Sequence, residues 1–247
     1  MKKFISVSVL ASSIVFGYYG KVEPYQTYNI KADVSGKVID VNKTAEGRKY
    51  NGIVIKIDDL QNKIDLKNLQ TQLKHLENIV QAQKKIVEKK KKTYEIYKIL
   101  KTKSQIEKDN KFYDYENSLI ALNQTQNNIS NIKSQIAKLK DTITKKSISF
   151  KHYIYKIDVN KGDYVSFATP IATTMDISKT KIDIYVPIDK IDSIKNKKIY
   201  INEKLSNFKI DKIYKVADTK YTTSYKVELI GRYPKISDIV KVEFKKH

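Results

Sequence analysis

The sequence predicts an α+β protein in which a long antiparallel helical hairpin is inserted into a β module and splits it in two. Between Gly52 and Gly162 there is neither glycine nor proline, so nothing over that span forces a helix to end. Segments rich in β-branched residues flank this span on both sides. About a third of the 247 residues lie in the hairpin, which leaves short flanks for compact folding and predicts an elongated molecule.

Two apolar seams define the arms of the hairpin. The first advances in steps of three and four residues, which keeps one stripe of a helix against a partner helix. The second drifts along its length, as a straight helix does relative to a 3.5-residue repeat. The polar residues 102–106 between the seams predict the hairpin loop. The first seam contains Leu66, Leu69, Leu73, Leu76, Val80, Gln83, Val87, Lys90, Tyr94 and Tyr97, and the second contains Phe112, Tyr115, Leu119, Leu122, Gln126, Ile129, Ile132, Ile136, Leu139 and Ile143.

Folding the seams together about this loop gives one consistent register. It pairs Tyr94 with Tyr115 and sets Gln83 opposite Gln126, where the two amides could satisfy each other and lock the register. Each arm, of about 38 residues, would extend roughly 57 Å at 1.5 Å per residue. Such an arm must project from a body.

An internal repeat predicts how the body is built. Val38–Asn42 matches Lys156–Asn160, and a glycine turn follows each copy, at Gly47 and at Gly162. Because the two ends of an antiparallel hairpin lie together, the copies are delivered side by side. We therefore expect them to complete one small sandwich, into which the hairpin is inserted.

The two ends of the chain differ in character. Lys2 and Lys3 precede an apolar run, Phe4 to Phe16, that falls short of the roughly 20 residues needed to cross a bilayer. Residues 1–20 are thus expected to be an export signal or an N-terminal membrane anchor, and whether the segment is cleaved or retained stays open. From 178 onward, several short alternating segments with turn signals between them predict an antiparallel barrel or sandwich.

Composition narrows the function. The net charge is +21, which raises the possibility of a basic coiled-coil protein that binds nucleic acid. We discount this alternative, because nearly all the positive charge is lysine and the arginines favoured in phosphate and base contacts are only Arg48 and Arg232. Charge is concentrated between Lys84 and Lys103, where nine lysines face Glu88 and Glu95. This stretch is either a solvated face or a surface for an acidic partner.

No catalytic or metal-binding pattern is found. Cysteine is absent, and His75, His152 and His247 lie apart from one another and from any carboxylate cluster. The sequence has neither a glycine-rich phosphate loop nor a nucleophile elbow. We therefore expect a protein that is not an enzyme and that has no cofactor.

The order of these features resembles the membrane fusion proteins, or periplasmic adaptors, of the HlyD/AcrA/MacA type. The resemblance rests on Gly20–Pro24, Ala32–Val38, the hairpin and Val159–Val165, and it covers nearly the whole chain. It implies a lipoyl-like β-sandwich formed by residues 21–62 and 146–177, a coiled-coil hairpin at 63–145 and a small antiparallel β-barrel at 178–247. Neither lipoyl-like half carries the sequence setting of a modified lysine, so no lipoate or biotin is expected, and an enzyme-borne carrier domain is disfavoured.

The resemblance also implies a function. Proteins of this family link an inner-membrane transporter of the ABC or RND type to an outer-membrane TolC-like channel for efflux or secretion. They act as homo-oligomers, trimers or hexamers, in the periplasm of Gram-negative bacteria, associated with the inner membrane. The tip of the hairpin would contact the channel, and the candidate contact residues here are Leu100, Lys101, Ser104 and Ile106. The cargo, the oligomeric state and the class of transporter, including a type I secretion system, stay open.

Overall fold

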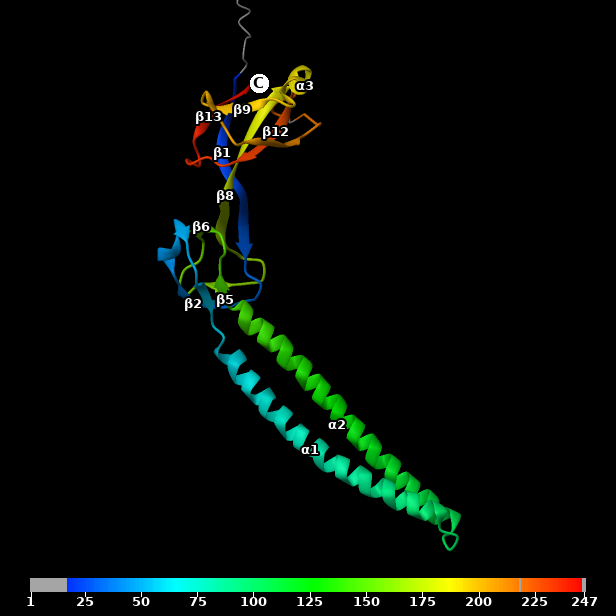
Figure 1. Ribbon diagram of the computed structural model, residues 1–247. Coiled ribbons are helices and arrows are strands. Elements are labelled where there is room, and N and C mark those ends of the chain that lie inside the picture. Colours follow the sequence, from blue (N-terminus) through cyan, green and yellow to red (C-terminus); the bar gives the residue numbers. More distant parts are fainter. Residues whose placement is uncertain (1–16, 218, 246–247) are drawn as a thin grey trace, which may run out of the picture.

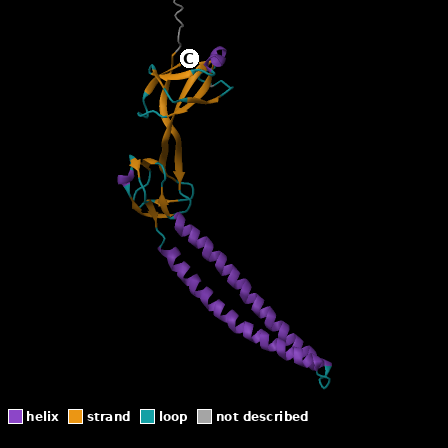
Figure 2. Ribbon diagram, in the orientation of Figure 1, coloured by secondary structure: helices purple, strands orange, loops and turns teal. Residues whose placement is uncertain are grey.

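The protein is an elongated α+β molecule with two β modules in line and a long helical hairpin that projects from one of them (Figure 1). The computed structural model describes residues 17–217 and 219–245, so the apolar run of the predicted export signal lies outside the described residues. Figure 2 shows that the helical structure is concentrated in the hairpin and that both modules are built from strands. This arrangement confirms the predicted α+β class with a long helical hairpin and antiparallel sheets.

The hairpin consists of α1 (Leu60–Ile99) and α2 (Gln105–Lys145). Five residues connect the helices, 100–104, so the loop begins two residues earlier than predicted. The two helices pack antiparallel along their lengths, as the paired seams require. The hairpin prediction is therefore confirmed.

The first seam lies where the sequence placed it. All ten of its positions are buried or half-buried, whereas most residues between them are exposed. Val80, at the centre of the seam, is the most buried. At the distal end, the rings of Tyr94 and Tyr115 stack with their centroids 6.3 Å apart, as the predicted register requires.

The second seam was predicted incorrectly in its distal half. Gln126 is exposed, and the positions that face α1 there are Ser118 and Thr125. Their hydroxyls donate to carbonyl oxygens of their own helix, Tyr115 at 2.7 Å and Ala121 at 3.1 Å, which allows small polar side chains to occupy an interface. With these two residues the seam follows strict steps of three and four from Tyr115 to Ile143 and does not drift.

The predicted contact between Gln83 and Gln126 is also wrong. Since Gln126 faces solvent, the Gln83 side chain turns to the backbone, and its Nε2 donates to the Ala121 carbonyl oxygen at 3.4 Å. The Ala121 carbonyl oxygen accepts the hydrogen bond from the Gln83 amide, so this side chain does not need a second glutamine as its partner.

The strands form two sheets. One has the order β5-β4-β2-β7, and the other has the order β10-β9-β13-β1-β8-β12-β11, with β6 added to β8 and β3 to β6. All of the strand pairs are antiparallel. The strands are β1 (Gly17–Lys31), β2 (Gly36–Val41), β3 (Arg48–Lys49), β4 (Ile53–Ile57), β5 (Ser147–Ser149), β6 (Tyr153–Ile157), β7 (Tyr164–Val165), β8 (Pro170–Pro187), β9 (Lys198–Ile201), β10 (Lys204–Leu205), β11 (Lys209–Ile213), β12 (Ser224–Gly231) and β13 (Ile239–Lys245).

The module next to the hairpin, called here the split module, is completed by residues from both sides of the insertion. Val38 and Ile57 precede the hairpin, Ile154 and Ile157 follow it, and all four side chains are buried in one core. Its four-stranded sheet also combines strands from both sides of the hairpin. The strands β4 and β2 precede the hairpin, and they pair with β5 and β7, which follow it. This joining of the two segments is what the internal repeat predicts.

Two side chains reinforce the junction. Lys43 and Glu46 lie on or beside a short 3₁₀ helix (Lys43–Ala45) ahead of the hairpin, and both reach Ile157 behind it. The Lys43 Nζ donates to the Ile157 carbonyl oxygen at 2.7 Å, and the Glu46 carboxylate accepts from the Ile157 amide at 2.6 Å. Both backbone groups of one residue are thus held by charged side chains from the other half of the chain.

The remaining strands form the second module, called here the terminal module. Its core includes Val22, Ile184, Leu229 and Val242, and a short helical segment that ends with α3 (Ile191–Ile194) buries Ile194 against it. The long strands β1 and β8 run through both modules, so the position 178 proposed as a boundary falls within β8. Residues 17–20 form the start of β1 and pair with β13 instead of extending the apolar run that precedes them.

We predict that Glu46→Ala lowers the free energy of unfolding by about 1–2 kcal/mol, because it leaves the Ile157 amide without its charged acceptor. Urea denaturation followed by tyrosine fluorescence measures the change. The matched control is Glu95→Ala, which removes only an exposed ion pair at 4.0 Å and should change stability by less than about 0.5 kcal/mol. Equal effects of the two substitutions would contradict the role given to Glu46.

The corrected seam makes a second prediction. Ile132→Ala should cost about 2–4 kcal/mol, because Ile132 is buried against α1, whereas Gln126→Ala should change stability by less than about 0.5 kcal/mol. Thermal unfolding followed by helical circular dichroism distinguishes the two. A large loss in Gln126→Ala would restore the seam first predicted.

Candidate functional site at the hairpin tip

The hairpin tip is the candidate functional site, and its loop is short and well ordered by local hydrogen bonds. Leu100 ends α1 in an extended conformation, and its amide donates to the Tyr97 carbonyl oxygen at 3.3 Å. Ser104 precedes the first turn of α2, also in an extended conformation. The chain therefore reverses between Leu100 and Ser104 without glycine or proline.

A capping box fixes the start of α2. The Ser104 Oγ accepts from the Glu107 amide at 3.3 Å, and the Glu107 carboxylate accepts from the Ser104 amide at 3.0 Å. The Lys103 Nζ reaches the other carboxylate oxygen of Glu107 at 2.9 Å. The hydrogen bond from Lys103 first, and then those from Ser104, lower the pKa of Glu107 from 4.5 to about 2.

Aromatic side chains stiffen the hairpin just behind the loop. The Tyr94 ring lies 5.4 Å from Phe112 and 6.3 Å from Tyr115 between centroids, so one layer contains three rings. One turn nearer the tip, the Tyr97 ring lies 5.2 Å from the Lys103 Nζ. The tip is thus a preorganised surface.

That surface is apolar at its centre. The Ile99 side chain is 78% exposed and Ile106 is 73% exposed, and Leu100 is exposed between them in the sequence. The structure brings together at one tip the four residues predicted from the sequence, but Ser104 is occupied as the helix cap. Ile99 was not predicted as a contact residue. The signal in the sequence is that this isoleucine lies outside the apolar seam and next to the loop, where no side chain of the hairpin is expected to cover it.

The flank of the tip is basic. Between Lys84 and Lys103, three ion pairs are formed: Lys92 with Glu88 at 2.8 Å, Lys91 with Glu95 at 4.0 Å and Lys103 with Glu107 at 2.9 Å. Within the described part of the chain, no ion pair involves the other six lysines of this stretch: Lys84, Lys85, Lys89, Lys90, Lys98 and Lys101. The uncompensated charge would favour an acidic partner, and salt would weaken that attraction.

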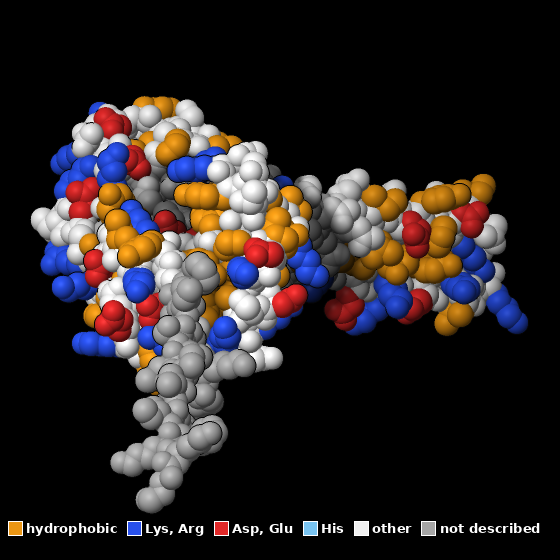
Figure 3. Space-filling view, turned by 90° about the horizontal axis from the view of Figure 1, so that it is seen from above, with side chains coloured by type: hydrophobic (Ala, Val, Ile, Leu, Met, Phe, Trp, Pro, Cys, Tyr) orange, Lys and Arg blue, Asp and Glu red, His pale blue; other side chains and the backbone are white. Residues whose placement is uncertain are grey.

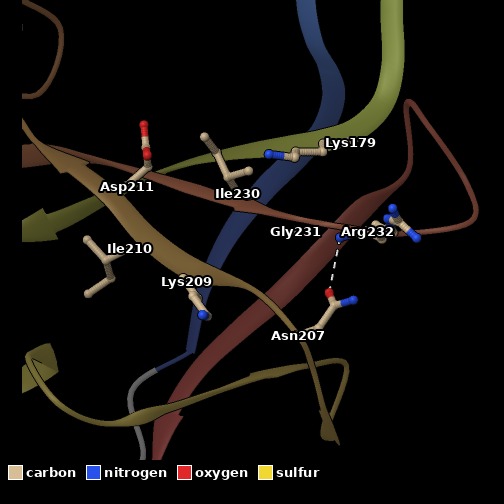
Figure 4. Close-up of a pocket in the computed structure, with 8 residues that line it drawn as sticks. All are labelled: Lys179, Asn207, Lys209, Ile210, Asp211, Ile230, Gly231 and Arg232. Carbon is tan, nitrogen blue, oxygen red and sulfur yellow. Dashed lines mark hydrogen bonds between the residues drawn. The ribbon is translucent and has the colours of Figure 1, made fainter.

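A hollow of about 470 Å³ lies on the terminal module (Figure 4). Three cationic side chains line it, Lys179, Lys209 and Arg232, and the Asn207 side chain accepts from the Arg232 amide at 3.0 Å. In Figure 4 the three cationic side chains point in different directions, so they do not converge on one ligand.

The remaining features reveal no chemistry. Among residues 17–217 and 219–245, no group of three or more histidine, aspartate or glutamate side chains is placed to hold a metal ion. His75 is exposed on α1, and the His152 ring stacks on Tyr28 with centroids 5.0 Å apart, while His247 lies outside the described residues. No helix in the described part of the chain is long and apolar enough to cross a membrane.

Comparison with solved structures identifies the fold. MacA from Actinobacillus actinomycetemcomitans matches with a TM-score of 0.76 and 17% identity, covering 94% of this chain and 78% of that protein. The membrane fusion protein Spr0693 from Streptococcus pneumoniae R6 matches with a TM-score of 0.59 and 9% identity. The match covers 95% of this chain and 100% of that protein. A MacA–MexA chimeric protein with the Pseudomonas aeruginosa MexA α-hairpin domain matches with a TM-score of 0.57 and 19% identity. The match covers 94% of this chain and 79% of that protein.

These matches are to the fold and not to the sequence. No protein-family model matches this chain, and no curated protein matches its sequence. The matched structures nevertheless cover both β modules and the hairpin. The chain has the fold of the membrane fusion proteins, and the resemblance noted in its sequence is confirmed at that level.

The capping box makes a prediction about pH. The depressed pKa of Glu107 means that its carboxylate stabilises the cap above about pH 4.5, and this contribution disappears as the pH falls toward about 2. A carboxyl-carbon NMR titration of the full chain should find this group near pH 2. In Lys103→Met the pKa should rise toward 4.5, because the largest cause of the shift is removed, and an unchanged value would contradict the assignment.

Proposed function

We propose that this protein is a periplasmic adaptor, a membrane fusion protein that links an inner-membrane transporter to an outer-membrane TolC-like channel for efflux or secretion. The observation that carries the proposal is the projecting hairpin, rooted in a β module that its own insertion divides. The similarity to MacA over 94% of the chain supports an adaptor role. The role is mechanical, and the protein is not an enzyme.

Each part of the molecule has a place in this proposal. The split module is the lipoyl-like sandwich, without a carrier lysine, and the terminal module is the adaptor β-barrel. The terminal module lies at the end from which residues 1–16 continue, and we assign it to the side of the inner membrane and the transporter. The hairpin then extends away from that membrane, toward the channel.

The tip is proposed to make the channel contact. Leu100 and Ile106 supply exposed apolar surface, Lys101 supplies charge, and Ile99 joins them on structural grounds. Ser104 acts indirectly, because it caps α2 and holds the loop in shape. A small apolar centre surrounded by lysines suits an acidic, partly apolar surface on the partner.

The shape of the molecule supports an assembly of several copies. A single arm has one tip, so surrounding a channel requires several copies, and we propose a homo-oligomer, a trimer or a hexamer, associated with the inner membrane in the periplasm of a Gram-negative bacterium. An ABC or an RND-type transporter fits the same geometry. The competing assignment, a basic coiled coil that binds nucleic acid, does not explain why the hairpin is inserted into a β module that it divides.

Photo-crosslinking from the tip tests the proposal. With a photo-reactive amino acid at Ile106 or Ile99, the full chain should crosslink to the channel protein of its own envelope. Ile53, which is exposed on the split module far along the chain from the tip, is the matched control position. Crosslinks from Ile53 but not from Ile106 would contradict tip docking.

A further inference from the structure

The outer face of the terminal module carries an unusual mixture of exposed apolar and cationic side chains. Three exposed hydrophobic residues lie on it: Tyr19 at 70%, Ile239 at 71% and Leu205 at 59% exposed. They belong to β1, β13 and β10, which are joined through β9 in one continuous sheet. Lysines alternate with them, because Tyr19 is opposite Lys241 and Ile239 is opposite Lys21. We call this surface the lysine–tyrosine face.

The positive charge of this face is only partly compensated. Glu243 pairs with Lys241 at 2.6 Å and with Lys245 at 2.7 Å, so one carboxylate serves two lysines. Lys245 also lies directly opposite Lys198 in the pairing of β13 with β9. Glu243 already compensates Lys245, whereas no ion pair among the described residues involves Lys198. An external anionic surface would give Lys198 a partner of opposite charge.

The position of the face identifies that surface. Tyr19 follows the apolar run that ends at Phe16 by three residues, which is at most about 10 Å of extended chain. If that run enters a bilayer, the face must lie near its headgroups. Figure 3 views the molecule from this end and shows lysine and hydrophobic side chains, with some acidic ones among them, around the start of the described chain. Lysine beside tyrosine and aliphatic residues is the composition of membrane–water interfaces.

We infer that the lysine–tyrosine face binds the surface of a bilayer that contains anionic lipid. The lysines attract the headgroups, and Tyr19, Ile239 and Leu205 enter the interfacial layer. The bilayer then compensates the charge of Lys198. The face thereby fixes how the terminal module sits on the membrane, in addition to any anchoring by the segment before it.

Lys198→Glu separates this role from a structural one. The substitution places opposite charges across β9 and β13, so the stability of the module should be unchanged or higher. It removes two units of positive charge from the face, so binding of the full-length chain to phosphatidylglycerol-containing vesicles should fall about tenfold or more, at about 1 kcal/mol per charge. Lys161→Glu, an equal charge change at an exposed turn of the split module, should leave binding unchanged.

A second measurement reports where the lipid lies. The chain has no cysteine, so Ile239→Cys, Leu205→Cys and Phe167→Cys each create one labelling site for an environment-sensitive dye. The emission maximum of dyes at 239 and 205 should shift to shorter wavelength on anionic vesicles. The emission of a dye at 167, which is exposed on the split module, should not change.

Three results would overturn the inference: equal binding to phosphatidylcholine vesicles, equal losses in Lys198→Glu and Lys161→Glu, or dyes at 239 and 205 that shift only when a solubilised transporter is added. The last result would mean that the face binds protein. Since the vesicle assay contains neither transporter nor channel, its outcome does not depend on the proposed adaptor function.

Discussion

The structure depends on one constraint: the chain must return, after two helices of 40 and 41 residues, to within hydrogen-bonding distance of the point it left. The split module has no complete core until this happens, because Val38 lies before the hairpin and Ile157 after it. At the root of the hairpin, the buried Lys146 donates to the Asp58 carbonyl oxygen and to Asn62, each at 2.6 Å, and so fastens the end of α2 to the start of α1. A long-range closure of this kind is entropically costly, and a stiff antiparallel hairpin reduces the cost by holding its own ends together.

The two modules are joined by strands that they share. Neither is connected to the other by a flexible linker, since β1 and β8 pair along most of their lengths and each contributes side chains to both cores. Gly20 allows this continuity, because a Cβ there would lie 2.5 Å from Ile182 and 2.8 Å from the Asp183 carbonyl oxygen. The two modules are therefore joined by two continuous strands that pair with each other.

Sequence reasoning located the large elements and one helix face correctly, and it failed where local chemistry overrode hydrophobicity. The α1 seam was predictable because leucine, valine and tyrosine mark it clearly. The α2 seam was not, because Ser118 and Thr125 satisfy their hydroxyls on their own backbone, which no pattern of apolar residues reveals. Ser104 was placed at the tip, but its capping role was missed, although the glutamate three residues later marks a capping box. The role of Lys198 depends on which residue lies across the sheet, and strand register is hard to read from one sequence.

The path of α1 is an arc, and Figure 1 shows the helix bowed along its length, with its concave side toward α2. A bowed rod and a straight one enclose different spaces when repeated about an axis. Straight helices would enclose a cylinder of constant diameter, whereas bowed helices would enclose a space whose diameter changes along the axis. In the proposed oligomer, the diameter of the opening would then be set by the curvature of the helix, and a substitution that straightened α1 would alter that diameter without changing the tip.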